Sequence, residues 1–80
     1  MRTAVVLPAL NEAHVIARVV GAAKRRAEVD AVYLVDDGST DGTARVARRA
    51  GARVIVHPHN RRVGAALRTG FRAAAGAGFD

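Results

Sequence analysis

The sequence predicts an α/β fold in which three parallel strands alternate with three helices. Three short apolar runs, at residues 3–7, 31–35 and 53–57, are each followed by a segment with helical periodicity. Strands that alternate with helices are joined by right-handed crossovers, so the strands are parallel and the helices cover the sheet. The chain has 80 residues, no cysteine and 50% hydrophobic residues. We therefore expect one small domain over residues 1–80, in a reducing compartment.

The first strand, residues 3–7, is expected to end before Pro8, because proline cannot donate a hydrogen bond to a β-ladder. Asn11 follows as a candidate helix N-cap. The next helix has apolar residues at i, i+3 and i+4 spacing and ends on basic residues, which the negative end of a helix dipole favours. Its expected inner face is Ile16, Val19, Val20, Ala23 and Ala27, and its basic end is Lys24, Arg25 and Arg26.

The second strand, residues 31–35, is free of charge, as expected for a strand buried on both faces. It leads into Asp36-Asp37-Gly38 and then into a short helix expected from about residue 40 to residue 50. The candidate caps of this helix are Ser39, Thr40 and Asp41, its inner face is Ala44, Ala47 and Ala50, and Gly51 is expected in the left-handed position past its end.

The third strand, residues 53–57, precedes a loop that contains His57, Pro58 and His59. A last helix is expected after this loop, and its glycine-rich end leads to Phe79-Asp80, where another strand is expected to begin. The expected inner face of the last helix is Val63, Leu67, Gly70, Phe71 and Ala74.

The three strand-to-helix loops, residues 8–12, 36–41 and 57–62, are expected to lie along one edge of the sheet. Open α/β sheets bind their ligands at the carboxyl ends of the strands, which is this edge. A carboxylate there can accept hydrogen bonds from a ribose or a base, so we expect Asp37 to face a ligand and Asp36 to support the turn. The alternative is that the two aspartates form only a tight turn.

Several other nucleotide-binding folds are disfavoured by the loop sequences. The first loop contains no glycine, which argues against a dinucleotide-binding domain and against a nucleotide-sugar pyrophosphorylase. No P-loop motif occurs, and the paired aspartates follow the second strand, whereas phosphate-accepting signalling domains have them after the first. The net charge of +6 suits an anionic partner, but the near absence of aromatic residues argues against nucleic acid.

Two motifs together resemble the opening of the inverting family 2 glycosyltransferases, which have the GT-A (Rossmann-like) fold. They are residues 5–12 (VVLPALNE) and residues 35–43 (VDDGSTDGT), and residues 60–71 (NRRVGAALRTGF) are similar to that family's third helix. The resemblance is greatest to polyprenyl-phosphate (dolichyl-phosphate-type) mannosyl- and glucosyltransferases. It implies transfer of a sugar from a nucleoside diphosphate sugar to an acceptor such as a polyprenyl phosphate, with inversion, in the cytoplasm or at the cytoplasmic face of a membrane.

The resemblance also implies roles for individual residues. Asp37 would bind the base and Glu12 the base or ribose side, whereas Leu10 replaces an aromatic residue that stacks on the base in many relatives. Val63 stands where many relatives have a basic residue, so a diphosphate contact would fall to Arg62 or Arg68. The implied nucleotide-sugar-binding residues are Pro8, Leu10, Glu12, Val35, Asp37 and Arg68.

The family's metal-binding D-x-D motif and its catalytic base would both lie beyond Asp80. The resemblance therefore implies an apparently truncated, N-terminal part of the domain without catalytic residues. A divalent cation (Mg or Mn) is expected in the complete enzyme, where it would neutralise the departing nucleoside diphosphate, but not bound by this chain. His57 and His59 are poorly spaced to replace that site. The alternative is a truncated, non-catalytic module that binds a nucleotide or pairs with a partner through its sheet edge.

Overall fold

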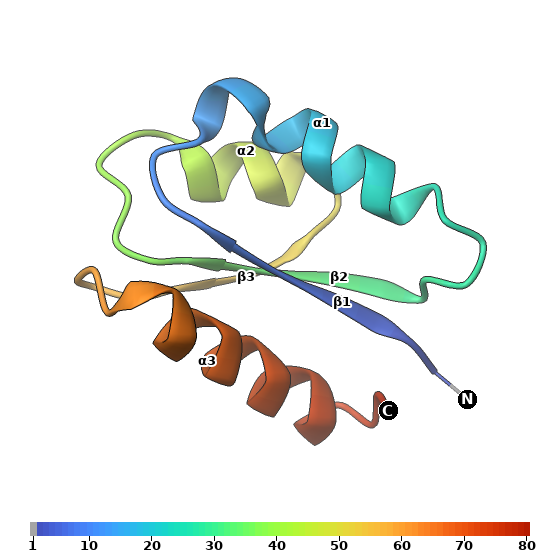
Figure 1. Cartoon of the computed structure of the whole chain (residues 1–80). Coiled ribbons are helices and arrows are strands. Elements are labelled where there is room, and N and C mark those ends of the chain that lie inside the picture. The colour runs from blue at the N-terminus through green and yellow to red at the C-terminus, as the bar shows by residue number, and fades with distance from the viewer. Residues whose placement is uncertain (1) are drawn as a thin grey trace.

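The three apolar runs form a parallel sheet in a computed structural model that describes residues 2–80 (Figure 1). The strands are β1 (Ala4–Ala9), β2 (Ala31–Asp36) and β3 (Arg53–Val56), and the helices are α1 (Ala13–Lys24), α2 (Thr43–Arg49) and α3 (Arg62–Gly76). β2 lies between the other two strands and pairs in parallel with both. The predicted fold, with alternating parallel strands and helices, is confirmed.

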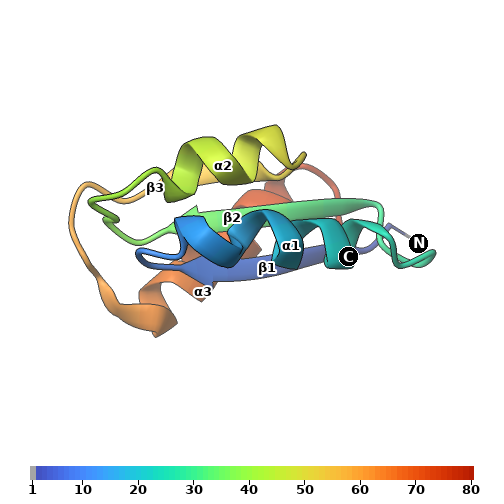
Figure 2. The same cartoon turned by 90° about the horizontal axis from the view of Figure 1, so that it is seen from above.

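Helices α1 and α2 lie side by side on one face of the sheet, and α3 covers the other face (Figures 1 and 2). β2 contributes to both layers because its side chains alternate between the two faces. Val32 and Leu34 belong to the core beneath α1 and α2, whereas Tyr33 belongs to the core beneath α3. Residues 32–36 are all buried, as expected for the central strand of a parallel sheet.

The inner face of α1 is narrower than the sequence predicts. Ile16 and Val20, one turn apart, are fully buried and pack in one cluster with Ala47 of α2. Val19 is 41% exposed, and Ala27 lies beyond the last helical residue, Lys24, so the prediction is wrong for both. α1 shares this face of the sheet with α2, and only the stripe through Ile16 and Val20 reaches the core.

Helix α3 packs on the sheet through its small residues, so its predicted inner face is confirmed at Gly70 and Ala74 and wrong at Val63 and Phe71. Its buried residues are Ala66, Gly70 and Ala74, spaced four apart, whereas Val63 is 62% exposed and Phe71 58% exposed. The reason is the close approach of the helix to β1, because a Cβ atom added at Gly70 would lie 2.3 Å from Cγ1 of Val6. Larger apolar side chains do not fit in that contact and therefore point outward.

Three element boundaries also differ from the prediction. β1 continues through Pro8 to Ala9, and Pro8 is tolerated because β1 is an edge strand. β3 ends at Val56, so His57 lies just after the strand. α2 begins at Thr43, about one turn later than expected, because residues of the loop before it form hydrogen bonds with the loop after β1.

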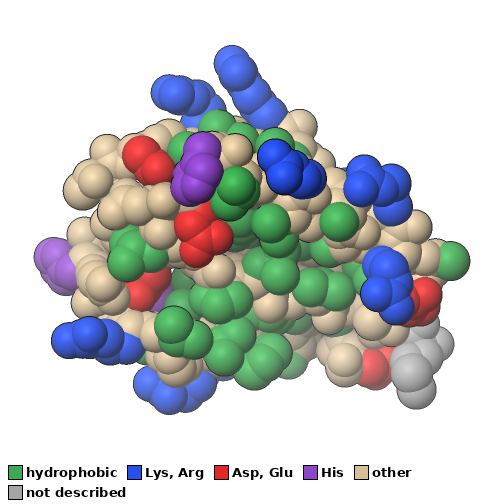
Figure 3. Space-filling view, turned by 45° about the horizontal axis from the view of Figure 1, so that its top comes forward, with side chains coloured by type: hydrophobic (Ala, Val, Ile, Leu, Met, Phe, Trp, Pro, Cys, Tyr) green, Lys and Arg blue, Asp and Glu red, His purple; other side chains and the backbone are tan. Residues whose placement is uncertain are grey.

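The two ends of the described chain meet beside β1. The backbone N–H of Arg2 donates to Oδ2 of Asp80, and the backbone N–H of Asp80 donates to the carbonyl of Arg2, both at 2.9 Å. Phe79 is buried edge-on against Tyr33, with 5.8 Å between the ring centroids. Figure 3 shows hydrophobic side chains gathered across the face where β1 is the edge of the sheet, with Lys and Arg side chains above them.

No helix within residues 2–80 is both long enough and apolar enough to cross a bilayer.

Candidate functional site

The loop after β2 holds the loop after β1 through side-chain hydrogen bonds. The backbone N–H of Asn11 donates to Oγ of Ser39 (2.8 Å), and that of Glu12 donates to Oγ1 of Thr43 (2.9 Å). In the other direction, the backbone N–H of Thr40 donates to Oδ1 of Asn11 (2.8 Å). Ser39 and Thr40 therefore connect two loops and do not cap their own helix.

The start of α1 is capped by a residue from another loop. Asn11 has a positive φ of 52° and is not the N-cap, so that prediction is wrong, and Glu12 in the N-cap position makes no side-chain capping bond. Asp41 accepts from the backbone N–H of Ala13 with Oδ2 (3.2 Å) and from that of Thr43 with Oδ1 (3.0 Å). One carboxylate therefore caps the first turns of both α1 and α2, where a negative charge is favoured.

Gly38 is the point where the loop after β2 touches the loop after β3. It has φ +89°, and an added Cβ would lie 2.8 Å from the backbone N of Asn60 and from the carbonyl carbon of His59. We expect Gly38→Ala to lower the free energy of unfolding by about 1–3 kcal/mol, because both the left-handed conformation and the contact exclude a Cβ. Urea denaturation would measure this loss, and an unchanged midpoint would contradict it.

The two aspartates at the end of β2 have different surroundings. Asp36 is buried and accepts with Oδ1 from the backbone N–H of Ser39 (2.9 Å), so it supports the turn as predicted. Asp37 is also buried, and its Oδ1 accepts from the backbone N–H of Arg61 (2.9 Å) and lies 2.8 Å from Nδ1 of His57. Both bonds end on the same oxygen, so they do not occupy Oδ2.

His57 is the site residue that the sequence analysis missed. Its side chain is 5% exposed, and the ring lies between Oδ1 of Asp37 and Oγ1 of Thr69 on α3, with Nε2 2.9 Å from that hydroxyl. A carboxylate only accepts hydrogen bonds, so Nδ1 of His57 carries a proton. The one signal in the sequence is the position of His57 directly after the third strand, which matches the position of Asp37 after the second.

Hydrogen bonds keep two carboxylates of these loops ionised. Burial raises the pKa of Asp37, but hydrogen bonds from the His57 ring and from the backbone of Arg61 and Arg62 lower it by more, so the net pKa is below that of an ordinary aspartate. The pKa of Asp41 is lowered mainly by the hydrogen bond from the Thr43 hydroxyl.

These shifts predict acid sensitivity of the fold. Below about pH 4 the unfolded chain binds more protons than the folded chain, so the free energy of unfolding falls as the pH falls. Urea denaturation at a series of pH values should show this decline, and Asp41→Asn should make it shallower. A free energy of unfolding that stays constant on acidification would contradict the prediction.

A cavity of about 370 Å³ opens between the first and third loops, at the carboxyl ends of the strands. Its walls are mostly apolar, and its charged groups are the carboxylates of Glu12 and Asp37 and the guanidinium of Arg62. Four of the six predicted site residues line it, namely Pro8, Leu10, Glu12 and Asp37, together with Ala9, Asn60, Arg62, Val63 and Ala66.

The other two predicted site residues lie away from this cavity. Val35 is fully buried in β2 on the face that α3 covers, where its Cγ2 would lie 3.3 Å from a Cβ on Gly70. Arg68 is exposed on α3, and its guanidinium lies over Gly64. Arg62, the other arginine considered for a diphosphate contact, does line the cavity and has a positive φ of 78°. Strained residues of this kind are concentrated at ligand sites.

The described residues do not form a site for the divalent cation that the resemblance implies. Among residues 2–80, no three His, Cys, Asp or Glu side chains lie close enough together to hold a metal ion. The carboxylates of Asp37 and Asp41 accept hydrogen bonds from neighbouring groups, and His57 lies between Asp37 and Thr69. No chemical step is therefore assigned to a metal at this site.

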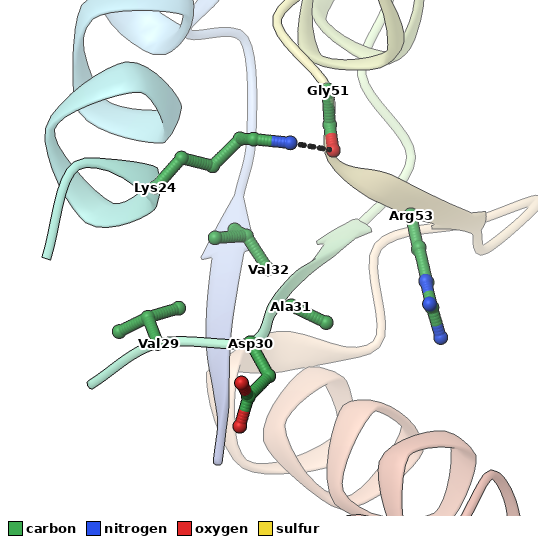
Figure 4. A pocket seen from close by; sticks show the side chains of 7 residues that line it. All are labelled: Lys24, Val29, Asp30, Ala31, Val32, Gly51 and Arg53. Carbon is green, nitrogen blue, oxygen red and sulfur yellow. Dashed lines mark hydrogen bonds between the residues drawn. The ribbon is translucent and has the colours of Figure 1, made fainter. Parts of the chain in front are cut away.

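A second, smaller cavity of about 140 Å³ lies at the opposite edge of the sheet (Figure 4). Its polar groups serve the fold, because Nζ of Lys24 donates to the carbonyl of Gly51 (3.2 Å) and Oδ2 of Asp30 accepts from the backbone N–H of Thr3 (2.7 Å). The carboxyl edge, with its larger cavity, is therefore the candidate functional site.

Comparison with known proteins shows the family of the chain. The family model described as Glycosyl transferase family 2 matches residues 4–77, nearly the whole chain. The chain belongs to this family. Protein MJ1222 of Methanocaldococcus jannaschii is 40% identical over 70 residues, and Protein RfbJ of Shigella flexneri is 43% identical over 51 residues. These matches cover 88% and 64% of this chain but only 28% and 40% of the relatives.

The chain is also similar to solved structures. Glucosyl-3-phosphoglycerate synthase from Mycobacterium tuberculosis superposes with a TM-score of 0.76 at 36% identity, covering 99% of this chain and 31% of the synthase. Another structure of that synthase contains Mn²⁺, UDP-glucose and phosphoglyceric acid and matches equally well. The resemblance to family 2 and the GT-A fold is confirmed, and the chain spans less than a third of the synthase.

Proposed function

We propose that this chain is the nucleotide-sugar-binding part of a glycosyltransferase that transfers a sugar from a nucleoside diphosphate sugar, with inversion. The observation that carries this proposal is the cavity at the carboxyl edge, where Asp37 and Glu12 lie beside apolar walls in a member of glycosyltransferase family 2. The residues needed for transfer are proposed to lie outside residues 2–80, so the described part alone is expected to bind donor without transferring sugar.

The lining of the cavity suggests a role for each kind of group. The carboxylate of Asp37 accepts hydrogen bonds from the base, and that of Glu12 accepts from the base or ribose. Pro8, Leu10 and Val63 provide apolar contact for the base. Arg62, which lines the cavity, replaces Arg68 as the proposed diphosphate contact, because a guanidinium matches phosphate oxygens.

The substrates are proposed by class. UDP-glucose is the donor to test first, because a structure of the similar synthase contains it. The proposed acceptor carries a phosphate group, either a polyprenyl phosphate, as the sequence resemblance implies, or a small phosphorylated acid like the phosphoglyceric acid in that structure. With a polyprenyl phosphate the protein would work at the cytoplasmic face of a membrane. A divalent cation in the complete enzyme would bind to residues outside those described.

Calorimetric titration of the full chain with UDP-glucose, UDP and GDP-mannose tests this function. We expect at least one of these ligands to bind, and free UDP to compete with UDP-glucose for the same site. Absence of binding by all three would overturn the proposal.

A second candidate is a non-catalytic module that pairs with a partner through β1. Its support is the position of β1 as an edge strand among residues 2–80, beside the exposed side chains of Val63 and Phe71. Self-association of a chain that binds no nucleotide would favour it.

A further inference from the structure

We infer that His57 is a positioning residue, whose Nδ1–H fixes the Asp37 carboxylate in the orientation that nucleotide binding requires. This inference rests on the proposed function and adds to it a residue that does not line the cavity. The structure supports it through the position of the ring, its two hydrogen-bond partners and its burial.

The backbone places the ring beside Asp37. The backbone N–H of His57 donates to the carbonyl of Asp36 (2.8 Å), which extends the pairing of β2 and β3 past Val56. His57 and Asp37 thus follow directly after two paired strands, and Nδ1 lies 2.8 Å from Oδ1. The side chains of His57 and Asp37 are 5% and 7% exposed, so little water can replace this bond.

The other ring nitrogen holds the ring in place. Nε2 lies 2.9 Å from Oγ1 of Thr69, in the middle of α3. A threonine hydroxyl can both donate and accept, so it can pair with this nitrogen whether or not the nitrogen carries a proton. The ring is therefore held on one side by α3 and presents its Nδ1–H to Asp37 on the other.

The effect on binding follows from the carboxylate geometry. The bonds from His57 and from the Arg61 backbone both end on Oδ1, and together they fix the plane of the carboxylate group. Oδ2 is left for a ligand in the cavity that Asp37 lines. Without the Nδ1–H donor the carboxylate loses one of the bonds that orient it, and a bound base meets a poorly oriented acceptor.

Two substitutions separate this role from a purely structural one. The side-chain amide of asparagine matches the position of Nδ1, so His57→Asn keeps a donor for Asp37 and loses the contact with Thr69. The longer side chain of glutamine matches the position of Nε2, so His57→Gln keeps the Thr69 contact and loses the donor. Each variant loses one buried hydrogen bond, so a purely structural role would affect both variants alike.

The experiment measures the affinity of the full chain for UDP-glucose by calorimetry, with thermal melting in parallel. We expect His57→Asn to remain within about threefold of wild type and His57→Gln to bind on the order of tenfold more weakly, with similar melting temperatures for the two. The matched control is His59→Asn on the exposed histidine two residues away, which should leave affinity unchanged. Equal affinities of His57→Asn and His57→Gln would overturn the inference.

A measurement on the wild-type chain keeps the inference testable if a variant fails to fold. Imidazole nitrogen NMR should show the Nδ1–H form of His57, and its Nδ1 signal should shift on addition of UDP-glucose while the signals of His59 do not. An Nδ1 signal of His57 that is unchanged at saturating UDP-glucose would overturn the inference. If wild type binds no nucleotide at all, the proposed function itself fails.

Discussion

Asp37→Asn is expected to weaken the binding of UDP-glucose to the full chain by about ten- to a hundredfold, because it replaces a charged acceptor in the cavity by a neutral amide. The amide oxygen can still accept the bonds from His57 and the Arg61 backbone that end on Oδ1. The NH₂ group of the asparagine then takes the place of Oδ2 of Asp37. This group donates hydrogen bonds, so it cannot accept one from the donor groups of the ligand. Calorimetric titration measures the loss of affinity.

Asp37 also has a structural role, because it accepts the hydrogen bonds of His57 and the Arg61 backbone. Asp37→Ala leaves the buried donors of His57 and Arg61 without an acceptor, and we expect it to destabilise the fold by about 1–3 kcal/mol besides abolishing binding. Asp30→Asn, at the opposite edge of the sheet, is the matched control and should leave affinity unchanged. An Asp37→Asn variant with wild-type affinity would contradict the proposed role of Asp37.

Gly70→Ala is expected to lower the free energy of unfolding by about 1–2 kcal/mol, although alanine is the better helix former. The added Cβ would lie 2.3 Å from Cγ1 of Val6 and 3.3 Å from Cγ2 of Val35, so α3 must move away from the sheet. Neither valine relieves the contact easily, because β-branched side chains have few rotamers. Urea denaturation of the variant measures the cost.

Two further variants test whether the contact with β1 is the cause. Gly76→Ala, at the end of the same helix, places its Cβ in open space and should be neutral or stabilising by up to about 1 kcal/mol. Val6→Ala should be less destabilising in the Gly70→Ala background than in wild type, because the smaller residue makes room for the new methyl group. If Gly70→Ala is as stable as wild type, the packing argument is wrong.

Element order and strand positions could be predicted because they depend on local patterns. The uncharged run at residues 31–35 is the buried central strand, and Gly51 has the left-handed conformation (φ +103°) expected past the end of α2. The inner faces of α1 and α3 were predicted less well, because hydrophobic periodicity shows that a helix has an apolar side and not how closely it approaches the sheet. On α3 the contact of Gly70 with Val6 selects alanines for the inner face and leaves Phe71 exposed.

The caps of α1 depend on a contact between loops that are distant in sequence. Asn11 has the chemistry of an N-cap, but Asp41 satisfies the backbone N–H of Ala13 from 28 residues away. Propensity describes a residue and its immediate neighbours, so it cannot predict a cap that comes from another loop. The same contact explains why α2 starts late, since the residues before Thr43 bind the first loop.

By itself, the sequence determined the alternating parallel fold, the family, and four residues that line one cavity: Pro8, Leu10, Glu12 and Asp37. These follow from short motifs, because the carboxyl ends of parallel strands always share one edge. Only the tertiary structure decided that Arg62 lines the cavity while Arg68 and Val35 do not, and that His57 lies against Asp37. Those placements depend on how α3 docks and on hydrogen bonds between residues twenty positions apart, which no local pattern encodes.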